Sequence, residues 1–92
     1  MLKVKYYPNP FVESVNIEYT TDEPVEITII MYDHIGLPVK DLMTNELVEV
    51  GKHKVIFDAR GLSKGMYIGL IKTKSHFQTI KLLLVDQEVK NI

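Results

Sequence analysis

The side chains best suited to acid–base chemistry or metal binding are three histidines, His34, His53 and His76. They lie 19 and 23 residues apart, whereas paired ligands of zinc sites are usually separated by about two to five residues. Each histidine falls at or beside a predicted turn, where an exposed imidazole is the ordinary case. The histidines therefore predict no shared metal site and no catalytic base.

The serines and carboxylates likewise give no support for a catalytic site. Ser14, Ser63 and Ser75 lack the context of a nucleophile elbow, and Ser63 belongs to a turn. The adjacent Asp22 and Glu23 fit a solvated turn better than a calcium loop. A carboxylate pair for glycoside hydrolysis stays open, although no carboxyl group has surroundings that would raise its pKa. We therefore expect no enzyme activity, no metal and no cofactor.

The composition is that of one electrically balanced domain. A chain of 92 residues fits a single compact unit. Eleven basic and twelve acidic residues give a net charge of −1, so the chain as a whole has no strong field for nucleic acid or anionic lipid. There is no Cys, which excludes disulfides and thiolate ligands. The apolar runs are far shorter than the roughly 18 residues that span a bilayer, so we expect no membrane insertion. The oligomeric state stays open.

Alternating apolar and polar residues dominate the sequence, without a helical period. Val15, Ile17 and Tyr19 alternate with polar residues, as in an antiparallel sheet with one buried face. In the next alternating segment, residues 24–32, the otherwise polar face ends with Ile30 and Tyr32. We therefore expect both faces of this strand to be covered at that end. Seven predicted strands span residues 2–7, 14–20, 24–32, 39–43, 52–57, 66–74 and 77–85. Seven short strands without a helix predict an all-β sandwich.

Two connections have the chemistry of hairpins. Asp33 begins a four-residue turn that ends at Gly36, which is free to take a left-handed backbone. The short polar loop of residues 74–76 joins the last two strands and favours an antiparallel hairpin. Asp33 and Asp58 each open a turn, so we expect their carboxylates to cap backbone N–H groups.

The remaining connections are marked by glycines and polar residues. Gly51 and Gly65 each stand just ahead of a predicted strand. Residues 44–49 are too short for an independent helix, and we expect them to cross from one sheet to the other. Residues 87–92 form a polar tail that we expect to fray, which leaves residues 1–86 as the domain.

The last predicted hairpin carries the clearest cluster of basic residues. Lys72, Lys74 and Lys81 lie on it, with His76 and Phe77 nearby. An OB-like barrel would bind nucleic acid with such residues. Lysines on an edge strand also discourage aggregation between sheets. The neutral overall charge favours that second interpretation, and we expect no nucleic-acid partner.

The most distinctive segment of the chain opens it, and consists of Tyr7, Pro8, Asn9, Pro10 and Phe11. Neither proline can donate to a sheet ladder, and each fixes its own φ. Asn9 is further restricted by the proline that follows it. We expect a rigid lead-in whose rings, Tyr7 and Phe11, plug the end of the sandwich.

This opening motif resembles the start of the C-terminal sorting domain (type A) of type IX secretion substrates, which typically begin with such a sequence. The resemblance continues in order from about residue 6 to residue 86. Further matching pieces are Ile17-Glu18-Tyr19, residues 25–39, Gly51-Lys52-His53, Phe57-Asp58, residues 61–67 and residues 81–85. The sandwich motifs also resemble the immunoglobulin-like domain of flagellar hook-capping proteins, but the opening motif favours the sorting domain.

The resemblance implies an immunoglobulin-like β-sandwich at the C-terminus of a larger exported protein of Bacteroidetes-type bacteria. Such a domain is a non-catalytic address that the outer-membrane secretion machinery recognises. A sortase-like protease often removes it afterwards, ahead of the folded domain. The expected route is the periplasm in transit and then the cell surface or the medium.

Four further residues match family motifs, and each also has an expected structural role. Gly36, Gly51 and Gly65 are expected to be turn glycines. Tyr67 follows Gly65 and Met66 and is expected to be a core or corner tyrosine. We expect all four to be chiefly structural.

The resemblance places recognition at the end of the domain, because in the family this end takes part in translocation. The predicted recognition residues are Lys81, Leu82, Leu83, Leu84 and Val85. Alternation predicts that Leu82 and Leu84 face the core together with Ile80. Leu83 and Val85 then face outward or toward a partner, as edge-on docking to another sheet would require.

Two alternatives come from other classes of protein. One is a fibronectin-type-III-like or carbohydrate-binding accessory module of a secreted hydrolase, which would need an exposed aromatic platform. We expect several of the eight aromatic residues to belong instead to the core or the opening motif. The other is a hook-cap-like domain that assembles with copies of itself.

Overall fold

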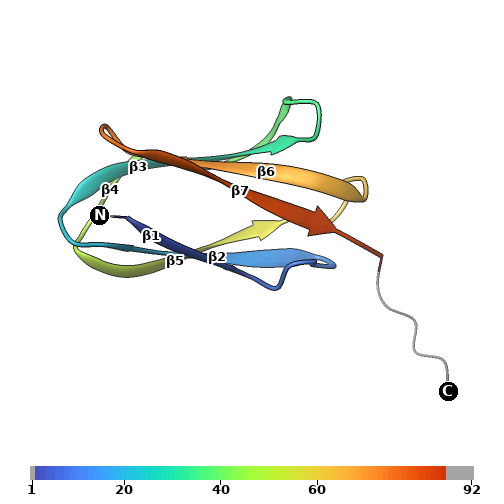
Figure 1. The fold of residues 1–92 in the computed structure, drawn as a ribbon, viewed down its shortest axis with the longest axis horizontal. Coiled ribbons are helices and arrows are strands. Elements are labelled where there is room, and N and C mark those ends of the chain that lie inside the picture. The colour runs from blue at the N-terminus through green and yellow to red at the C-terminus, as the bar shows by residue number, and fades with distance from the viewer. Residues whose placement is uncertain (1, 87–92) are drawn as a thin grey trace, which may run out of the picture.

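A computed structural model describes residues 2–86 and has seven strands (Figure 1). Their bounds are β1 Lys3–Tyr7, β2 Ser14–Thr21, β3 Val25–Asp33, β4 Pro38–Val48, β5 Gly51–Asp58, β6 Gly65–Lys72 and β7 Phe77–Leu84. The predicted all-β class is confirmed. Within residues 2–86 no helix is long and apolar enough to cross a membrane. The expected polar tail, residues 87–92, lies outside the described residues.

The strands form two layers, as in an immunoglobulin-like sandwich (Figure 1). One sheet has three strands in the order β1-β2-β5, and the other has four in the order β4-β3-β6-β7. Every pair of neighbouring strands is antiparallel. Alternation along each strand gives each sheet one apolar face, and burying both faces requires the sheets to stack.

The core lies between the sheets and takes residues from almost every strand. Phe11, Val15, Ile17, Ile27, Ile29, Met31, Phe57, Ile71 and Leu82 have no exposed surface. Gly69 sits within β6, where a Cβ atom would come within 2.9 Å of Ile80 Cγ1 and 3.0 Å of Met31 Sδ. Side chains from β3 and β7 therefore fill the space that a side chain at this position would need, which explains a glycine in the middle of a strand.

One predicted connection is wrong. Residues 44–48 do not cross between sheets, because β4 continues through them and pairs Glu46, Leu47 and Val48 with β3. A β-bulge makes this possible: Asn45 takes a φ of 47°, and its backbone N–H donates to Thr28 Oγ1 at 3.0 Å. A bulge lets the strand bend and continue. The crossing between sheets is confined to the two residues before Gly51.

Both predicted hairpins are confirmed. Asp33 Oδ1 accepts hydrogen bonds from the backbone N–H of Ile35 at 3.0 Å and of Leu37 at 2.9 Å. Gly36 follows with a φ of 91°, which a side chain would strain. At the second hairpin the Thr73 N–H donates to His76 O at 2.8 Å. Asp58 also caps as expected, since its Oδ1 accepts from the Arg60 N–H at 3.1 Å.

Candidate functional site

The opening motif lies along the outer edge of β7. The Phe11 N–H donates to Leu83 O at 2.8 Å, and the Val85 N–H donates to Phe11 O at 2.9 Å. This short parallel bridge joins Phe11 to the end of the terminal strand. Two segments about seventy residues apart therefore form one structural unit, which we call the junction.

The Asn9 side chain extends the junction by one more pair of hydrogen bonds. Its Nδ2 donates to Lys81 O at 3.0 Å, and its Oδ1 accepts from the Leu83 N–H at 3.0 Å. A carboxamide carries the same donor and acceptor as a peptide group, so it can replace a strand residue that the flanking prolines prevent from pairing. Both prolyl bonds, Tyr7–Pro8 and Asn9–Pro10, are cis.

The two aromatic rings of the opening motif differ in their burial. Phe11 is completely buried, and its ring centroid is 6.0 Å from that of Phe57. Tyr7 is 42% exposed, so the prediction that it plugs the sandwich is wrong. It stands on the outer face of β1, where its hydroxyl donates to Glu18. That hydrogen bond raises the pKa of the Tyr7 hydroxyl.

The terminal strand has the two faces that its alternation predicts. Ile80, Leu82 and Leu84 are buried in the core. Leu83 and Val85 are partly exposed, and Lys81 is exposed. The five predicted recognition residues therefore divide between the two faces, and Lys81, Leu83 and Val85 are accessible to a partner.

An apolar surface continues from Leu83 across the four-stranded sheet. Leu83 pairs with Met66, the neighbouring outer residue Ile68 pairs with Tyr32, and Leu70 pairs with Ile30. These side chains are at least partly exposed. We call them the apolar outer face: Ile30, Tyr32, Met66, Ile68, Leu70 and Leu83.

The apolar outer face corrects one expectation from the sequence. Ile30 and Tyr32 were expected to be covered on both sides, but no other layer of residues 2–86 packs on this face. Apolar residues on both faces of a strand are the signal that could have found it. That pattern alone cannot distinguish cover within the chain from cover by a partner.

The other family-motif residues have structural positions, at the starts of strands or in the core. Gly51 and Gly65 begin β5 and β6 with φ values of 127° and 138°. Tyr67 is 5% exposed, and its hydroxyl donates to Ser63 O at 2.5 Å. Burial raises the pKa of this hydroxyl. The expectation of a core or corner tyrosine is confirmed.

The histidines do not come together. His34 and His76 are exposed at separate turns. His53 is partly buried within β5, where its ring stacks on Tyr19 with centroids 5.3 Å apart and its Nε2 is 2.7 Å from Glu49 O. Among the described residues no group of three His, Asp or Glu side chains could hold a metal ion.

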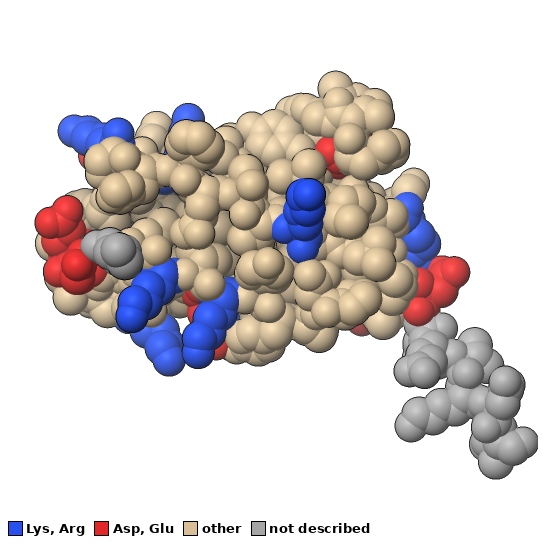
Figure 2. Space-filling model, in the orientation of Figure 1, with Lys and Arg blue, Asp and Glu red and all other residues tan. Residues whose placement is uncertain are grey.

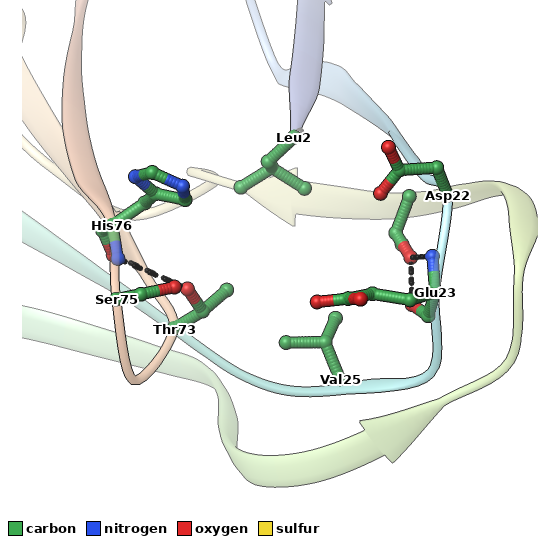
Figure 3. Close-up of a pocket in the computed structure, with 8 residues that line it drawn as sticks. Leu2, Asp22, Glu23, Val25, Thr73, Ser75 and His76 are labelled. Carbon is green, nitrogen blue, oxygen red and sulfur yellow. Dashed lines mark hydrogen bonds between the residues drawn. The ribbon is translucent and has the colours of Figure 1, made fainter.

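A small cavity opens at the end of the sandwich between the β2–β3 and β6–β7 turns (Figure 3). Its volume is about 60 Å³, far below the several hundred Å³ of a typical ligand pocket. Leu2 and Val25 supply apolar walls, and the hydroxyl groups of Thr21 and Thr73 form hydrogen bonds within their own turns. The His76 N–H, for example, donates to Thr73 Oγ1 at 3.2 Å (Figure 3). The cavity has no features of a substrate site.

The exposed aromatic residues do not form a platform for a glycan. Tyr6 and Tyr7 are on β1 in the three-stranded sheet, whereas Phe77, 75% exposed, is on β7 in the other sheet. The basic residues Lys72 and Lys81 share the outer face of the four-stranded sheet, and Lys74 lies in the hairpin beyond them. The structure gives no support to the accessory-module alternative.

The fold and the junction define a class: an immunoglobulin-like sandwich whose terminal strand is bonded to its opening segment. Comparison with known families specifies it further. Residues 5–86 match the family described as the secretion system C-terminal sorting domain, and the chain belongs to that family. It carries a C-terminal sorting signal for type IX secretion, which implies export and interaction with that secretion machinery. No curated protein and no solved structure matches the chain.

Proposed function

We propose that the type IX machinery recognises the folded terminal strand together with the opening motif that is bonded to it. Residues 1–86 are the sorting domain in this proposal, and they act by binding without catalysing a reaction. The junction is the observation that supports it. Four hydrogen bonds join the edge of the terminal strand to the opening motif. On the strand they involve Lys81 O, the Leu83 N–H, Leu83 O and the Val85 N–H.

The contact surface in this proposal is the accessible side of the terminal strand. Leu83 and Val85 offer apolar side chains, and Lys81 offers a charge beside them. Leu83 continues into the apolar outer face through its pairing with Met66. Exposed apolar patches of this kind often mark protein–protein contacts. Leu82 and Leu84 contribute indirectly, because their burial fixes the strand.

The proposal includes the steps around recognition. The domain passes through the periplasm folded, delivers its cargo to the surface or the medium, and a sortase-like protease then removes it. The opening motif is tied into the domain by Phe11, which is fully buried. A cut ahead of Tyr7 would therefore leave the junction whole.

A matched pair of variants tests the proposed surface. Leu83→Asp places a charge on the terminal strand, and Leu47→Asp places the same charge at a 69% exposed position on β4, at the opposite edge of the same sheet. Each is tested as a fusion of residues 1–92 to an inert reporter. We expect Leu83→Asp to reduce delivery to the cell surface at least tenfold and Leu47→Asp to leave it within twofold (a tenfold change corresponds to about 1.4 kcal/mol).

Folding must be measured beside delivery. Thermal unfolding of both purified variants shows whether each is folded at the growth temperature. Equal delivery by the two variants, both folded, would refute the proposed surface. A Leu83→Asp variant that is unfolded is replaced by Leu83→Gln, which makes the position polar without adding a charge.

A further inference from the structure

Four lysines lie together on the outer face of the three-stranded sheet. Lys3 and Lys5 are on β1, and Lys52 and Lys54 are on β5. Both strands pair with β2, so Thr20 stands between Lys3 and Lys52, and Glu18 stands between Lys5 and Lys54. All four lysines are exposed. We call them the lysine face.

The register fixes the size of this lysine face. Neighbouring strands are about 4.8 Å apart and alternate residues of one strand about 7 Å apart. The four Cα atoms therefore mark a rectangle of roughly 10 by 7 Å. Figure 2, in which this sheet lies below, shows Lys or Arg side chains gathered beneath the end where β1 begins.

The lysine face is not neutralised by the rest of the described chain. The ion pairs recorded within residues 2–86 are Arg60–Asp58 and Lys64–Asp86, neither of which involves these lysines. Glu18 is the acidic residue among them, and it accepts a hydrogen bond from the Tyr7 hydroxyl. The four lysines and Glu18 together carry a formal charge of +3, and Asp58, further along the same face of β5, is paired with Arg60. Because the whole chain carries −1, the remainder carries −4.

Apolar and aromatic groups lie beside the charges on the same face. Tyr7 and Ile56 flank Asn16 in the next row of the sheet, and they are 42% and 51% exposed. Side chains with an apolar body and a polar tip, such as tyrosine and lysine, are suited to the boundary between water and lipid. Flexible ammonium groups also match phosphates as point charges, without the planar fork that arginine would supply.

We propose that the lysine face docks the domain onto a surface of phosphate-bearing lipid headgroups. The lysines attract the phosphates, and Tyr7 and Ile56 contact the headgroup region beside them. The contact is peripheral, with no strand entering the bilayer. The lysine face is on the three-stranded sheet and the apolar outer face is on the four-stranded sheet. The domain can therefore contact lipid through one sheet while the apolar outer face remains accessible. This inference is independent of how the secretion machinery reads the terminal strand.

Vesicle binding by the full 92-residue chain tests the proposal. The probes are vesicles of phosphatidylcholine alone and vesicles with about one third phosphatidylglycerol, at low and physiological salt. Each lysine near an anionic surface contributes about 1 kcal/mol, which is about fivefold in binding. We expect binding to the anionic vesicles that weakens as salt rises, and about a 25-fold loss for Lys52→Gln/Lys54→Gln.

A variant with the same net charge supplies the control. Lys72→Gln/Lys81→Gln removes two lysines from the other sheet and is expected to change vesicle binding less than twofold, well under 1 kcal/mol. Absence of binding by the parent chain would overturn the proposal, and so would equal losses in the two variants. Equally tight, lysine-dependent binding to soluble polyglutamate would also overturn it, because an acidic protein would then be the better partner.

Discussion

Short polar side chains complete the backbone hydrogen bonding at two turns and at one strand edge of this sandwich. Asp33 and Asp58 accept from N–H groups two residues on, and Asn9 replaces a peptide group at the edge of β7. The aspartates were predictable, because an Asx turn is a local arrangement that a short sequence specifies. The partner of Asn9 was not predictable, since it lies 72 residues further along the chain.

Asp58 provides a prediction at this scale. The Arg60 side chain donates to its carboxylate, at 2.7 Å from Nη2 to Oδ2, and holds the pKa of Asp58 at about 2, below its ordinary 3.8. A lowered folded-state pKa stabilises the protein above about pH 4 and loses that contribution as the pH falls toward 2. We expect Arg60→Gln to raise the pKa of Asp58 in an NMR titration of its carboxyl carbon.

The control is Lys64→Gln, which removes the other recorded surface ion pair, between Lys64 and Asp86. It should leave the pKa of Asp58 where it is. An unchanged Asp58 pKa in Arg60→Gln would show that the capped turn, and not the guanidinium, lowers it.

At the scale of elements, the notable feature is how the edge of β7 is covered. An exposed strand edge can pair with other chains. Here the opening motif covers the edge from Lys81 to Val85. The earlier part of β7, which begins at Phe77, extends beyond this junction. The motif therefore protects the part of the strand that the proposed function assigns to recognition.

Asn9→Ala tests this arrangement. Losing two hydrogen bonds is expected to lower the free energy of unfolding by about 1–2 kcal/mol and to speed amide hydrogen exchange at Leu83. Asn16→Ala is the matched control, because Asn16 donates to Tyr7 O at 3.2 Å without touching β7. It should leave Leu83 exchange unchanged. Unaltered Leu83 exchange in Asn9→Ala would mean that the side chain does not protect the strand edge.

The strands themselves were largely predictable, and their assembly was less so. Alternation located all seven because side chains change face at every residue. The end of β4 was missed because the bulge at Asn45 depends on Thr28 in the neighbouring strand. The lysine face was missed for a related reason: Lys3 and Lys52 become neighbours only because β1 and β5 both pair with β2.

At the scale of the whole molecule, the sandwich presents two different surfaces. The four-stranded sheet carries the apolar outer face and the terminal strand, and the three-stranded sheet carries the lysine face. A balanced net charge of −1 conceals this division, because total charge does not describe where charges lie. The family supplies the role, a sorting signal, and our two proposals assign the two surfaces to different partners.

Delivery of an inert reporter tests the central claim most directly. The reporter, preceded by a signal for export to the periplasm, is fused ahead of residues 1–92 in a bacterium with a type IX system and in a strain that lacks its outer-membrane component. We predict reporter at the surface or in the medium of the first strain and in the periplasm of the second. Retention of a folded fusion in the periplasm of both strains would contradict the account.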